Sequence, residues 1–283
     1  ENFQALSLMQ ARYREQVKCI YIDPPYNTGQ DSFVYRDSYQ HSSWLAMVVA
    51  RLAMGEELLE SQGAMFISID DNEAARLSVA IASELRRSHH STNIIWQKVD
   101  SPNDNKVALT PDHEYVLCLS IDPLLQQFRP MVDPSILEAY RKNKETGVLY
   151  RDRLLKKNGA NSRRIDRPTM YFPIRNPDGN DAYPVHDDGE EACWALGKPT
   201  VEKLQAAGEL VWKRRTVAGV ERWEPYTRET APDVPTRPYP TIWLDVKTMR
   251  QAKSQLRALF GTSAIVETVK PTQLIERILT MSG

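Results

Sequence analysis

The feature that most constrains the fold is a short apolar strand that stops at an acid and two prolines. Residues 19–22 are β-prone, and Asp23, Pro24, Pro25 and Tyr26 follow them directly. Proline has no backbone N–H to donate, so regular strand pairing must end at Pro24. Consecutive prolines also restrict the backbone and fix where the Asp23 and Pro24 carbonyls point. The chain therefore presents a carboxylate, a fixed carbonyl and an aromatic ring on one rigid corner.

This corner suits the orientation of an amine on a flat heterocycle. The exocyclic amine of a nucleobase is a poor nucleophile because its lone pair is delocalised into the ring. The Asp23 carboxylate and the Pro24 carbonyl can accept both N–H protons, and such acceptors act through placement and electrostatics. The Tyr26 ring can stack on a base that has left the duplex. The alternative interpretation is a strand that ends in a proline turn with an incidental acid.

The motif resembles the catalytic motif of the amino-methyltransferases that modify DNA bases. With the continuation through Asn27-Thr28-Gly29 and the run from Tyr39 to Leu45, it looks like the modification (Mod) subunit of type III restriction–modification systems. The resemblance implies transfer of a methyl group from S-adenosylmethionine to the N6 amine of a flipped adenine in DNA. It also implies two sets of site residues. The catalytic set is Asp23, Pro24, Pro25 and Tyr26, and the donor-binding set is Asp23, Thr28, Lys270 and Pro271.

Other functions remain open at this stage. The chain could act as a DNA-binding or subunit-binding module without catalysis, or as an N4-cytosine or RNA amino-methyltransferase. The basic residues described below favour nucleic acid but do not separate DNA from RNA. The resemblance further implies double-stranded DNA as substrate, a restriction (helicase/nuclease) subunit as partner, and a homodimeric parent protein.

Helical and strand patterns alternate after the motif. A cap at Ser42 or Ser43 precedes apolar residues at helical spacing from Leu45 to Leu59, and this helix is expected to stop near Gln62-Gly63. An apolar strand at 64–69 follows, and Asp70 is interpreted mainly as the cap of the next helix. This order predicts a parallel α/β unit with ligands at the carboxyl ends of its strands.

Two further strands, at 93–98 and 113–119, predict a hairpin with a polar loop between them. Residues 28–40 are polar and aromatic, and they form either a loop over the site or a plain surface loop. With the resemblance, the expected fold is α/β: a partial Rossmann-like methyltransferase sheet with an inserted mixed, β-rich target-recognition subdomain. The expected parts are catalytic core at 1–125, recognition insert at 126–240, and return to the core at 241–283. The end of the insert, Tyr226 to Pro240, is expected to be a proline-rich connector back to the core.

Basic residues are concentrated in the middle of the chain. Between Arg141 and Arg175 there are eleven Lys or Arg residues against three acids, with aromatic residues among them. Lys and Arg neutralise phosphates, although a solvated surface is the alternative. Because the resembled family keeps its recognition region here, the patch predicts DNA contact. Trp96, Lys98 and His113 match landmarks that the resembled family has beside the target base. This match implies that Lys98 also contacts DNA. The predicted DNA-binding residues are Lys98, Lys156, Lys157, Arg163, Arg164 and Arg167.

Composition bounds the remaining possibilities. The 283 residues carry a formal net charge of −1, so overall charge neither demands nor excludes a nucleic-acid partner. The three cysteines are isolated and share no ligand spacing with the five histidines, so no metal site is expected. No membrane span or signal peptide is recognisable, and we expect a cytoplasmic protein.

The resemblance also implies a segment that the sequence does not contain. In this motif order, a strand and a Phe-x-Gly-x-Gly loop that cradles S-adenosylmethionine should follow the helix after Lys270 and Pro271. No such loop occurs in the sequence. We therefore expect a fragment that is inactive by itself, with an exposed sheet edge that favours association.

Overall fold

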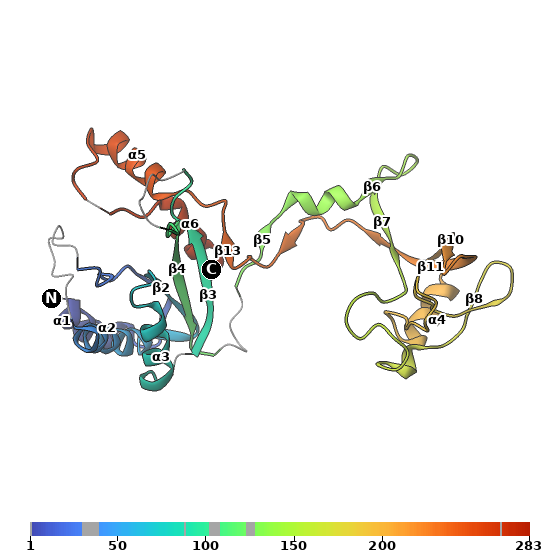
Figure 1. Ribbon diagram of the computed structural model, residues 1–283, viewed down its shortest axis with the longest axis horizontal. Helices are drawn as coiled ribbons and strands as arrows, with labels where there is room; N and C mark the ends of the chain where they lie inside the picture. Colours follow the sequence, from blue (N-terminus) through green and yellow to red (C-terminus); the bar gives the residue numbers. More distant parts are fainter. Residues whose placement is uncertain (1, 30–39, 88, 102–107, 123–127, 267) are drawn as a thin grey trace. The chain divides into compact units, whose positions relative to one another are not determined.

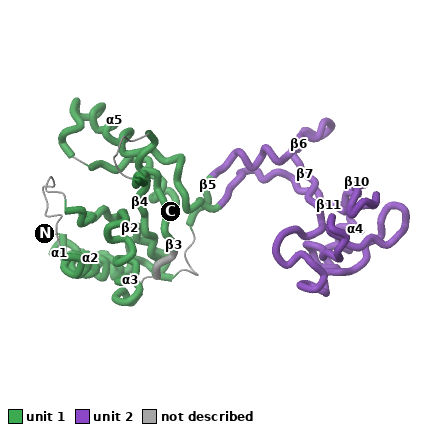
Figure 2. Tube along the Cα trace, viewed as in Figure 1, with its two compact units in different colours: residues 1–131, 238–283 green, residues 132–237 purple. Residues whose placement is uncertain are grey.

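The computed structural model describes residues 2–29, 40–87, 89–101, 108–122, 128–266 and 268–283. Most of the loop expected at 28–40 therefore lies outside the described residues. The chain forms two compact units, each described here by itself (Figure 2). Unit 1 comprises Glu1–Met131 and Pro238–Gly283, and unit 2 comprises Val132–Arg237. The sequence analysis placed these boundaries after 125 and 240.

Unit 1 is an α/β unit built on a five-stranded sheet (Figure 1). Its helices are α1 (Asn2–Tyr13), α2 (His41–Glu56), α3 (Ala74–Glu84), α5 (Met249–Phe260) and α6 (Thr272–Ser282). Its strands are β1 (Val17–Ile22), β2 (Leu59–Ile69), β3 (His89–Gln97), β4 (His113–Ser120) and β13 (Ile242–Trp243).

The sheet of unit 1 is mixed, in the order β1-β2-β4-β3-β13. Strands β1 and β2 are parallel and are joined through α2, as the strand–helix–strand pattern predicts. Strand β4 is antiparallel to both β2 and β3, so the predicted β3–β4 hairpin is present. The parallel pair therefore brings the carboxyl ends of β1 and β2 to the same edge of the sheet.

The two faces of this sheet pack against different helices because successive side chains of a strand point to opposite sides. Met65, Ile67 and Ile69 of β2 pack in one buried cluster with side chains of α2 and α3. Ala64 and Phe66 lie in the other cluster, with side chains of α6. All five side chains are at most 1% exposed. The α/β core that the sequence predicts is confirmed.

Helix α2 ends earlier than its apolar spacing predicts. It stops at Glu56, and Leu58 and Leu59, which continue the helical spacing, leave the helix. Leu59 instead opens β2 and pairs with Val17 of β1. Both leucines are at most 1% exposed in these positions. A turn and a core strand bury them as fully as a helix face would, so the predicted helix end at Gln62-Gly63 is wrong.

Neither of the two predicted helix caps is found. The N-cap of α2 is Gln40, whose backbone is extended, and Ser42 and Ser43 lie inside the helix. The N-cap of α3 is Glu73, which makes no side-chain cap hydrogen bond, and Asp70 Oδ1 instead accepts the backbone N–H of Asn72 at 3.0 Å in the turn before the helix. The serine prediction is wrong because the helix begins at His41, one residue before Ser42.

Unit 2 is rich in β-structure with little helix, and its elements are short. Its strands are β5 (Met131–Val132), β6 (Arg141–Lys142), β7 (Leu149–Leu154), β8 (Ile174–Arg175), β9 (Asp181–Ala182), β10 (Leu210–Val217), β11 (Val220–Thr230) and β12 (Thr236–Arg237). The first residue of β5 is the last residue of the first segment of unit 1. Helix α4 spans Lys198–Ala206, and 3₁₀ turns span Pro134–Ala139 and Pro168–Met170. An antiparallel sheet in the order β10-β11-β7-β6 forms its main layer.

Strand β11 extends into a region expected to be a proline-rich connector. The predicted connector begins at Tyr226, but β11 contains Pro225 and continues to Thr230. The Pro225 carbonyl accepts the N–H of Leu155 at 2.9 Å, so the proline takes part in the sheet through its acceptor alone. The connector is therefore shorter than predicted.

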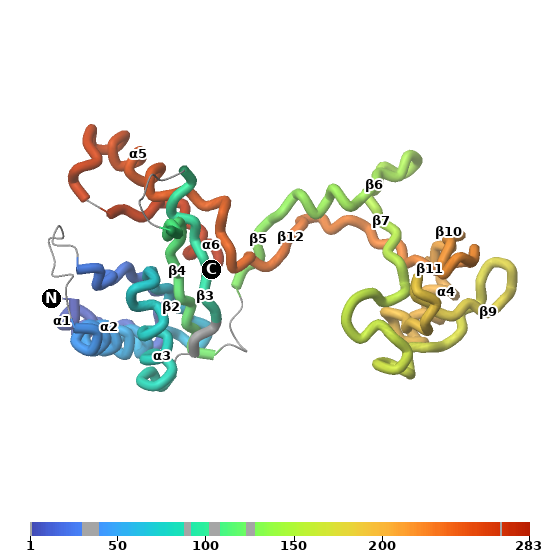
Figure 3. Tube along the Cα trace, in the orientation of Figure 1, coloured from blue at the N-terminus to red at the C-terminus, as the bar shows by residue number. Residues whose placement is uncertain are grey.

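The chain leaves unit 1 and returns to it through two adjacent segments. Strands β5 and β12 pair as a two-stranded ribbon, and the N–H of Asp133 donates to the carbonyl of Pro235 at 2.8 Å (Figure 3). Arg237 and Asp133 also form an ion pair. Within the described part of the chain, no helix is long and apolar enough to cross a lipid bilayer.

Candidate active site

The Asp-Pro-Pro-Tyr corner lies at the carboxyl end of β1 in unit 1. The indole N–H of Trp44, a fully buried side chain of α2, donates to the carbonyl of Pro25 at 2.7 Å. This bond fixes the corner against the helix that follows it. The Asp23 side chain remains 37% exposed. The sequence thus folds into a corner that is anchored from behind and open at its carboxylate.

Two acceptors on this corner have no partner in the described part of the chain. Asp23 uses Oδ1 for its contacts with Tyr26 and Lys270. Neither Asp23 Oδ2 nor the carbonyl oxygen of Pro24 accepts a hydrogen bond from a described residue. These two oxygens therefore remain available to accept N–H groups from outside the chain.

Tyr26 connects two carboxylates. Its hydroxyl lies 3.0 Å from Asp23 Oδ1 and 3.0 Å from Glu114 Oε2. A phenol has one proton, so it donates to one of the two carboxylates at a time. Burial, followed by the negative charges of Asp23 and Glu114, raises the pKa of Tyr26, and the phenol therefore stays protonated. The two contacts of the hydroxyl also hold the Tyr26 ring in place.

Lys270 reaches the same carboxylates from the far end of the sequence. It precedes α6, and its Nζ lies 3.3 Å from Asp23 Oδ1 and 2.9 Å from Glu114 Oε2. The side chain is only 8% exposed, and Nζ lies 4.9 Å from the centroid of the Tyr26 ring. A buried ammonium of this kind needs paired charges, and two carboxylates supply them. The next residue, Pro271, is buried and is the N-cap of α6.

Glu114 is the central carboxylate of the site, and sequence reasoning did not select it. Its side chain on β4 is 4% exposed and contacts Tyr26, Lys270 and Lys98. Lys98 Nζ lies 3.5 Å from Glu114 Oε1 and is 18% exposed. An acid at the start of an otherwise apolar strand was the available signal, since a buried Glu needs a partner. Lys98, predicted to bind DNA, is thus placed at the candidate active site.

The environment of Asp23 shifts its pKa. Partial burial raises the pKa of the carboxyl group, the Lys270 ammonium and the Tyr26 hydroxyl lower it, and the charge of Glu114 raises it again. The result is a pKa above the ordinary value of an aspartate. Asp23 is therefore a better proton acceptor than an aspartate in water.

A second buried carboxylate holds the chain on both sides of the undescribed loop. Glu73 is fully buried before α3, and its Oε1 accepts the side-chain amide of Asn27 at 2.6 Å. Nδ1 of His41 lies 2.5 Å from the same oxygen. Asn27 has a φ of +59°, in the left-handed region that asparagine tolerates. Thr28, predicted near the methyl donor, follows Asn27 as an exposed residue.

The other predicted DNA-binding residues lie in unit 2. The Lys156 side chain is 3% exposed, and its Nζ donates to the carbonyl of Val185 at 2.7 Å. Its burial leaves no exposed ammonium for a phosphate. Arg163 and Arg164 are half-exposed and are each paired with carboxylates of unit 2. The involvement of Lys157, Arg163, Arg164 and Arg167 in DNA binding stays a prediction.

The sequence of this chain matches the family described as DNA methylase over residues 17–283. The chain belongs to this family. The type III restriction–modification enzyme EcoPI Mod subunit of Escherichia phage P1 is 27% identical over 97% of this chain and 49% of its own length. The StyLTI Mod subunit of Salmonella typhimurium is 26% identical over 100% of this chain and 45% of its own length.

The matches with relatives cover only part of their length. The chain spans about half the length of the curated Mod subunits that it matches. Among solved structures, PvuII DNA methyltransferase (cytosine-N4-specific) is 11% identical and aligns with a TM-score of 0.37, covering 44% of this chain and 49% of that chain. Membership of the DNA methylase family rests on the sequence match over residues 17–283.

Proposed function

We propose that this chain carries the amine-accepting half of a site that methylates the N6 amine of a flipped adenine in DNA, within a restriction–modification system. One observation carries the proposal. Asp23 Oδ2 and the Pro24 carbonyl are adjacent acceptors without partners among the described residues. They match the two N–H groups of an exocyclic amine, and the match of the chain to the DNA methylase family supports this assignment.

Orientation of the amine is the main task of the two acceptors. When both N–H groups donate to Asp23 and Pro24, the nitrogen lone pair turns away from the base ring and toward the donor. The nitrogen then forms a bond to the methyl carbon while the bond from that carbon to sulfur breaks, and sulfur keeps the electron pair. The methylated nitrogen releases one proton, which the Asp23 carboxylate accepts because its pKa is raised.

Lys270 and Tyr26 hold the acceptor in place. The ammonium of Lys270 and the hydroxyl of Tyr26 both contact Asp23 Oδ1, which leaves Oδ2 for the amine. The Tyr26 ring is the stacking surface for the flipped base. These contacts set the direction of the carboxylate before substrate binds, and preorganisation of this kind lowers the barrier to transfer.

S-adenosylmethionine is the methyl donor in this proposal, and it supplies an electrophilic methyl group. The fit of this chain to the donor is partial. Lys270 contacts Asp23 directly and is followed by Pro271, and Thr28 lies five residues beyond Asp23 in the sequence, which supports these four residues as the donor-binding set. The ionised Asp23 carboxylate attracts the positive sulfonium. Pro271 fixes the start of α6 and so the position of Lys270.

The choice of adenine, the restriction partner and the homodimer rest on the similarity to type III Mod subunits. An Asp at the first position of the motif favours adenine over cytosine in the resembled enzymes. The relatives are named as subunits of restriction–modification enzymes, which supports a restriction subunit as the partner.

The decisive experiment replaces Asp23 in the full-length protein. Asp23→Ala should lower methyl transfer to duplex DNA by about a thousandfold or more, because it removes an acceptor and the proton acceptor together. DNA affinity should stay within about twofold, since most protein–DNA affinity comes from phosphate contacts. Methyl incorporation is measured with labelled donor, and the product nucleoside is identified by mass spectrometry.

The matched control is Asp71→Ala, which removes an exposed carboxylate next to the end of β2. This variant should retain methyl transfer within about twofold, because Asp71 makes no contact with the corner. Retained methyl transfer in Asp23→Ala contradicts the proposed function. Recovery of N4-methylcytosine instead of N6-methyladenine contradicts the choice of base.

A further inference from the structure

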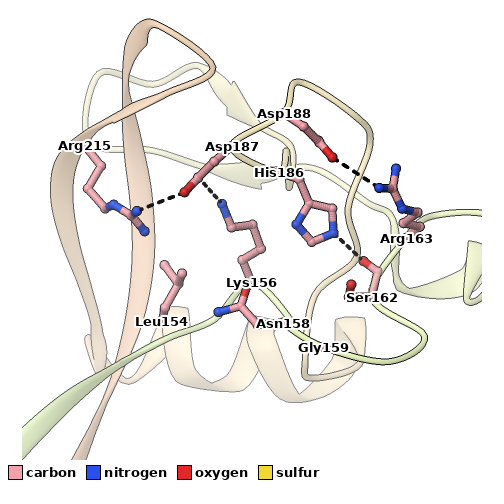
Figure 4. A pocket seen from close by; sticks show the side chains of 10 residues that line it. All are labelled: Leu154, Lys156, Asn158, Gly159, Ser162, Arg163, His186, Asp187, Asp188 and Arg215. Carbon is pink, nitrogen blue, oxygen red and sulfur yellow. Dashed lines mark hydrogen bonds and ion pairs between the residues drawn. The ribbon is translucent and has the colours of Figure 1, made fainter.

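The basic residues predicted to bind DNA in unit 2 are balanced by acids that follow later in the sequence. A cavity of about 470 Å³ is lined by Lys156, Arg163 and Arg215, together with Asp187 and Asp188. Figure 4 shows Asp187 between Lys156 and Arg215, and Asp188 facing Arg163. The cations therefore point at carboxylates of their own chain.

The formal charge around this cavity is slightly negative. Three cations line it, and four carboxylates contact them, because Glu190 also pairs with Arg163 and Glu224 lies 3.5 Å from Lys156. Nearby, Arg164 is paired with Glu191 at 2.9 Å. A phosphate approaching these cations would have to displace carboxylates, so this surface is a poor site for an anion.

A second charged cluster in unit 2 has the opposite balance. The Asp152 side chain on β7 is 1% exposed and contacts three cations. Lys213 Nζ lies at 2.8 Å, Arg228 Nε lies at 2.9 Å, and Arg141 forms a third ion pair. Burial alone would raise the pKa of Asp152, but hydrogen bonds from Arg228 and Lys213 lower it to about 2. The single negative charge of Asp152 is thus paired with three positive charges, and the cluster has a net charge of two positive charges.

Aromatic rings hold these cations in fixed positions. The guanidinium groups of Arg141 and Arg228 lie 4.9 Å and 4.4 Å from the centroid of the Tyr150 ring. Lys213 Nζ lies 4.5 Å from the centroid of the Tyr226 ring. Side chains held by a ring and a carboxylate lose little conformational entropy when they bind a ligand. The cluster is therefore preorganised for binding an anion.

The cations retain donors for a ligand. Arg141, Lys213 and Arg228 are 57%, 36% and 44% exposed. Arg228 uses only Nε toward Asp152, so its terminal nitrogens make no hydrogen bond with described residues. Arg141 and Lys213 line a cavity of about 290 Å³, together with Arg151 and the exposed Glu138. The charge of Arg151 is balanced by Glu229. Arg153 also pairs with Glu229. When its charge is included, the cations of this surface outnumber the carboxylates, and the net charge is positive.

We propose that Arg141, Lys213 and Arg228 around Asp152 form a binding site for the phosphodiester backbone of duplex DNA. The choice of DNA as the phosphodiester rests on the proposed function. Arginine and lysine donors contact phosphate oxygens, and the fixed geometry places the duplex on the sheet of β7, β10 and β11. Arg141 belongs to the basic stretch from Arg141 to Arg175, whereas Lys213 and Arg228 lie outside it, and none of the three is among the residues predicted to bind DNA.

The test measures binding of a labelled DNA duplex by fluorescence anisotropy over a series of salt concentrations, without methyl donor. Arg141→Ala should weaken binding about fivefold and reduce the slope of log affinity against log salt by about 0.9, because one phosphate contact is lost. Lys213→Gln should act in the same direction. Thermal unfolding of each variant confirms that unit 2 remains folded.

The matched control is Arg214→Ala in the same unit. Arg214 is 51% exposed and lies over the Trp223 ring at 4.8 Å, but it faces two carboxylates, Asp178 and Glu221. Its removal should change binding less than twofold. Equal losses for Arg141→Ala and Arg214→Ala, a larger loss for Arg163→Ala, or no duplex binding by the unsubstituted chain would overturn the proposal. Methyl transfer, which depends on Asp23, is scored separately and tests the proposed function alone.

Discussion

Glu114 determines the balance of charge at the candidate site. It is held between Lys98 and Lys270, and it also contacts the Tyr26 hydroxyl. Together, Asp23 and Glu114 carry two negative charges against the two positive charges of the lysines. Because these groups lie close together, removing the charge of Lys270 or of Glu114 changes the pKa of Asp23 in a direction that follows from the sign of the lost charge.

Removal of Lys270 should shift the pH profile of methyl transfer toward higher pH. The ammonium favours the ionised form of Asp23 and lowers its pKa, so Lys270→Met leaves the pKa of Asp23 higher than before. If the carboxylate is the active form, transfer is lost as pH falls through that pKa, and the loss then begins at a higher pH. The measurement is kcat/KM against pH. An unchanged acid limb contradicts the role of Lys270 beside Asp23.

Removal of the charge on Glu114 should shift the same profile in the opposite direction. Glu114 raises the pKa of Asp23, so Glu114→Gln lowers it and moves the acid limb to lower pH. The rate on the plateau should fall on the order of tenfold, because Lys270 and Tyr26 lose a shared anchor. A purely structural role for Glu114 would lower the rate without moving the limb, and opposite shifts in the two variants are the expected result.

At the scale of elements, Gly63 shows how the sheet is built. Pairing between β1 and β2 passes from Val17↔Leu59 to Cys19↔Ala64, so β2 carries extra residues in a bulge. A Cβ on Gly63 would lie 2.9 Å from the carbonyl oxygen of Val17. The glycine that pattern reasoning assigns to a helix end is thus needed for close approach of two strands.

Substitution of Gly63 should therefore destabilise unit 1. Gly63→Ala places a methyl group against backbone atoms that cannot move independently, and the expected loss is about 1–3 kcal/mol in the free energy of unfolding. Urea denaturation followed by circular dichroism measures it. Ser61→Ala, at an exposed position of the same strand, should change stability by less than about 0.5 kcal/mol. Equal stability of the two variants would show that the bulge adapts without strain.

At the scale of the whole molecule, the two units have separate hydrophobic cores. The two clusters of unit 1 contain side chains from residues 17–128 and 239–281, and the cluster of unit 2 lies within residues 155–212. The chain passes between the units through the β5–β12 ribbon. Among the described residues, the side chains of each core come from one unit.

Deletion of unit 2 should leave unit 1 folded. Joining Asp133 to Pro235 through an Asn-Gly turn closes the ribbon where its strands already pair. The shortened chain should show one cooperative thermal transition and the circular dichroism of an α/β protein, while duplex binding should be lost with the cluster around Asp152. A non-cooperative transition would mean that unit 1 depends on unit 2 for stability.

Local sequence accounts for much of this protein. The apolar strand, the Asp-Pro-Pro-Tyr corner and the β3–β4 hairpin follow from local preferences, because proline chemistry and strand periodicity act over a few residues. The motif also led to Lys270, through its resemblance to a family. The ends of α2 and β11 did not follow, because Leu59 and Tyr226 fit two elements equally well by pattern.

The tertiary structure alone decided how the charges are paired. Sequence order separates Glu114 from Lys270, and it separates Arg163 from Asp188 and Glu190, whereas folding brings each of these pairs into contact. Electrostatic interactions depend on distance in space, which composition and periodicity do not specify. The structure therefore added Glu114 to the candidate site, and it assembled the cluster around Asp152 for which we propose a contact with DNA.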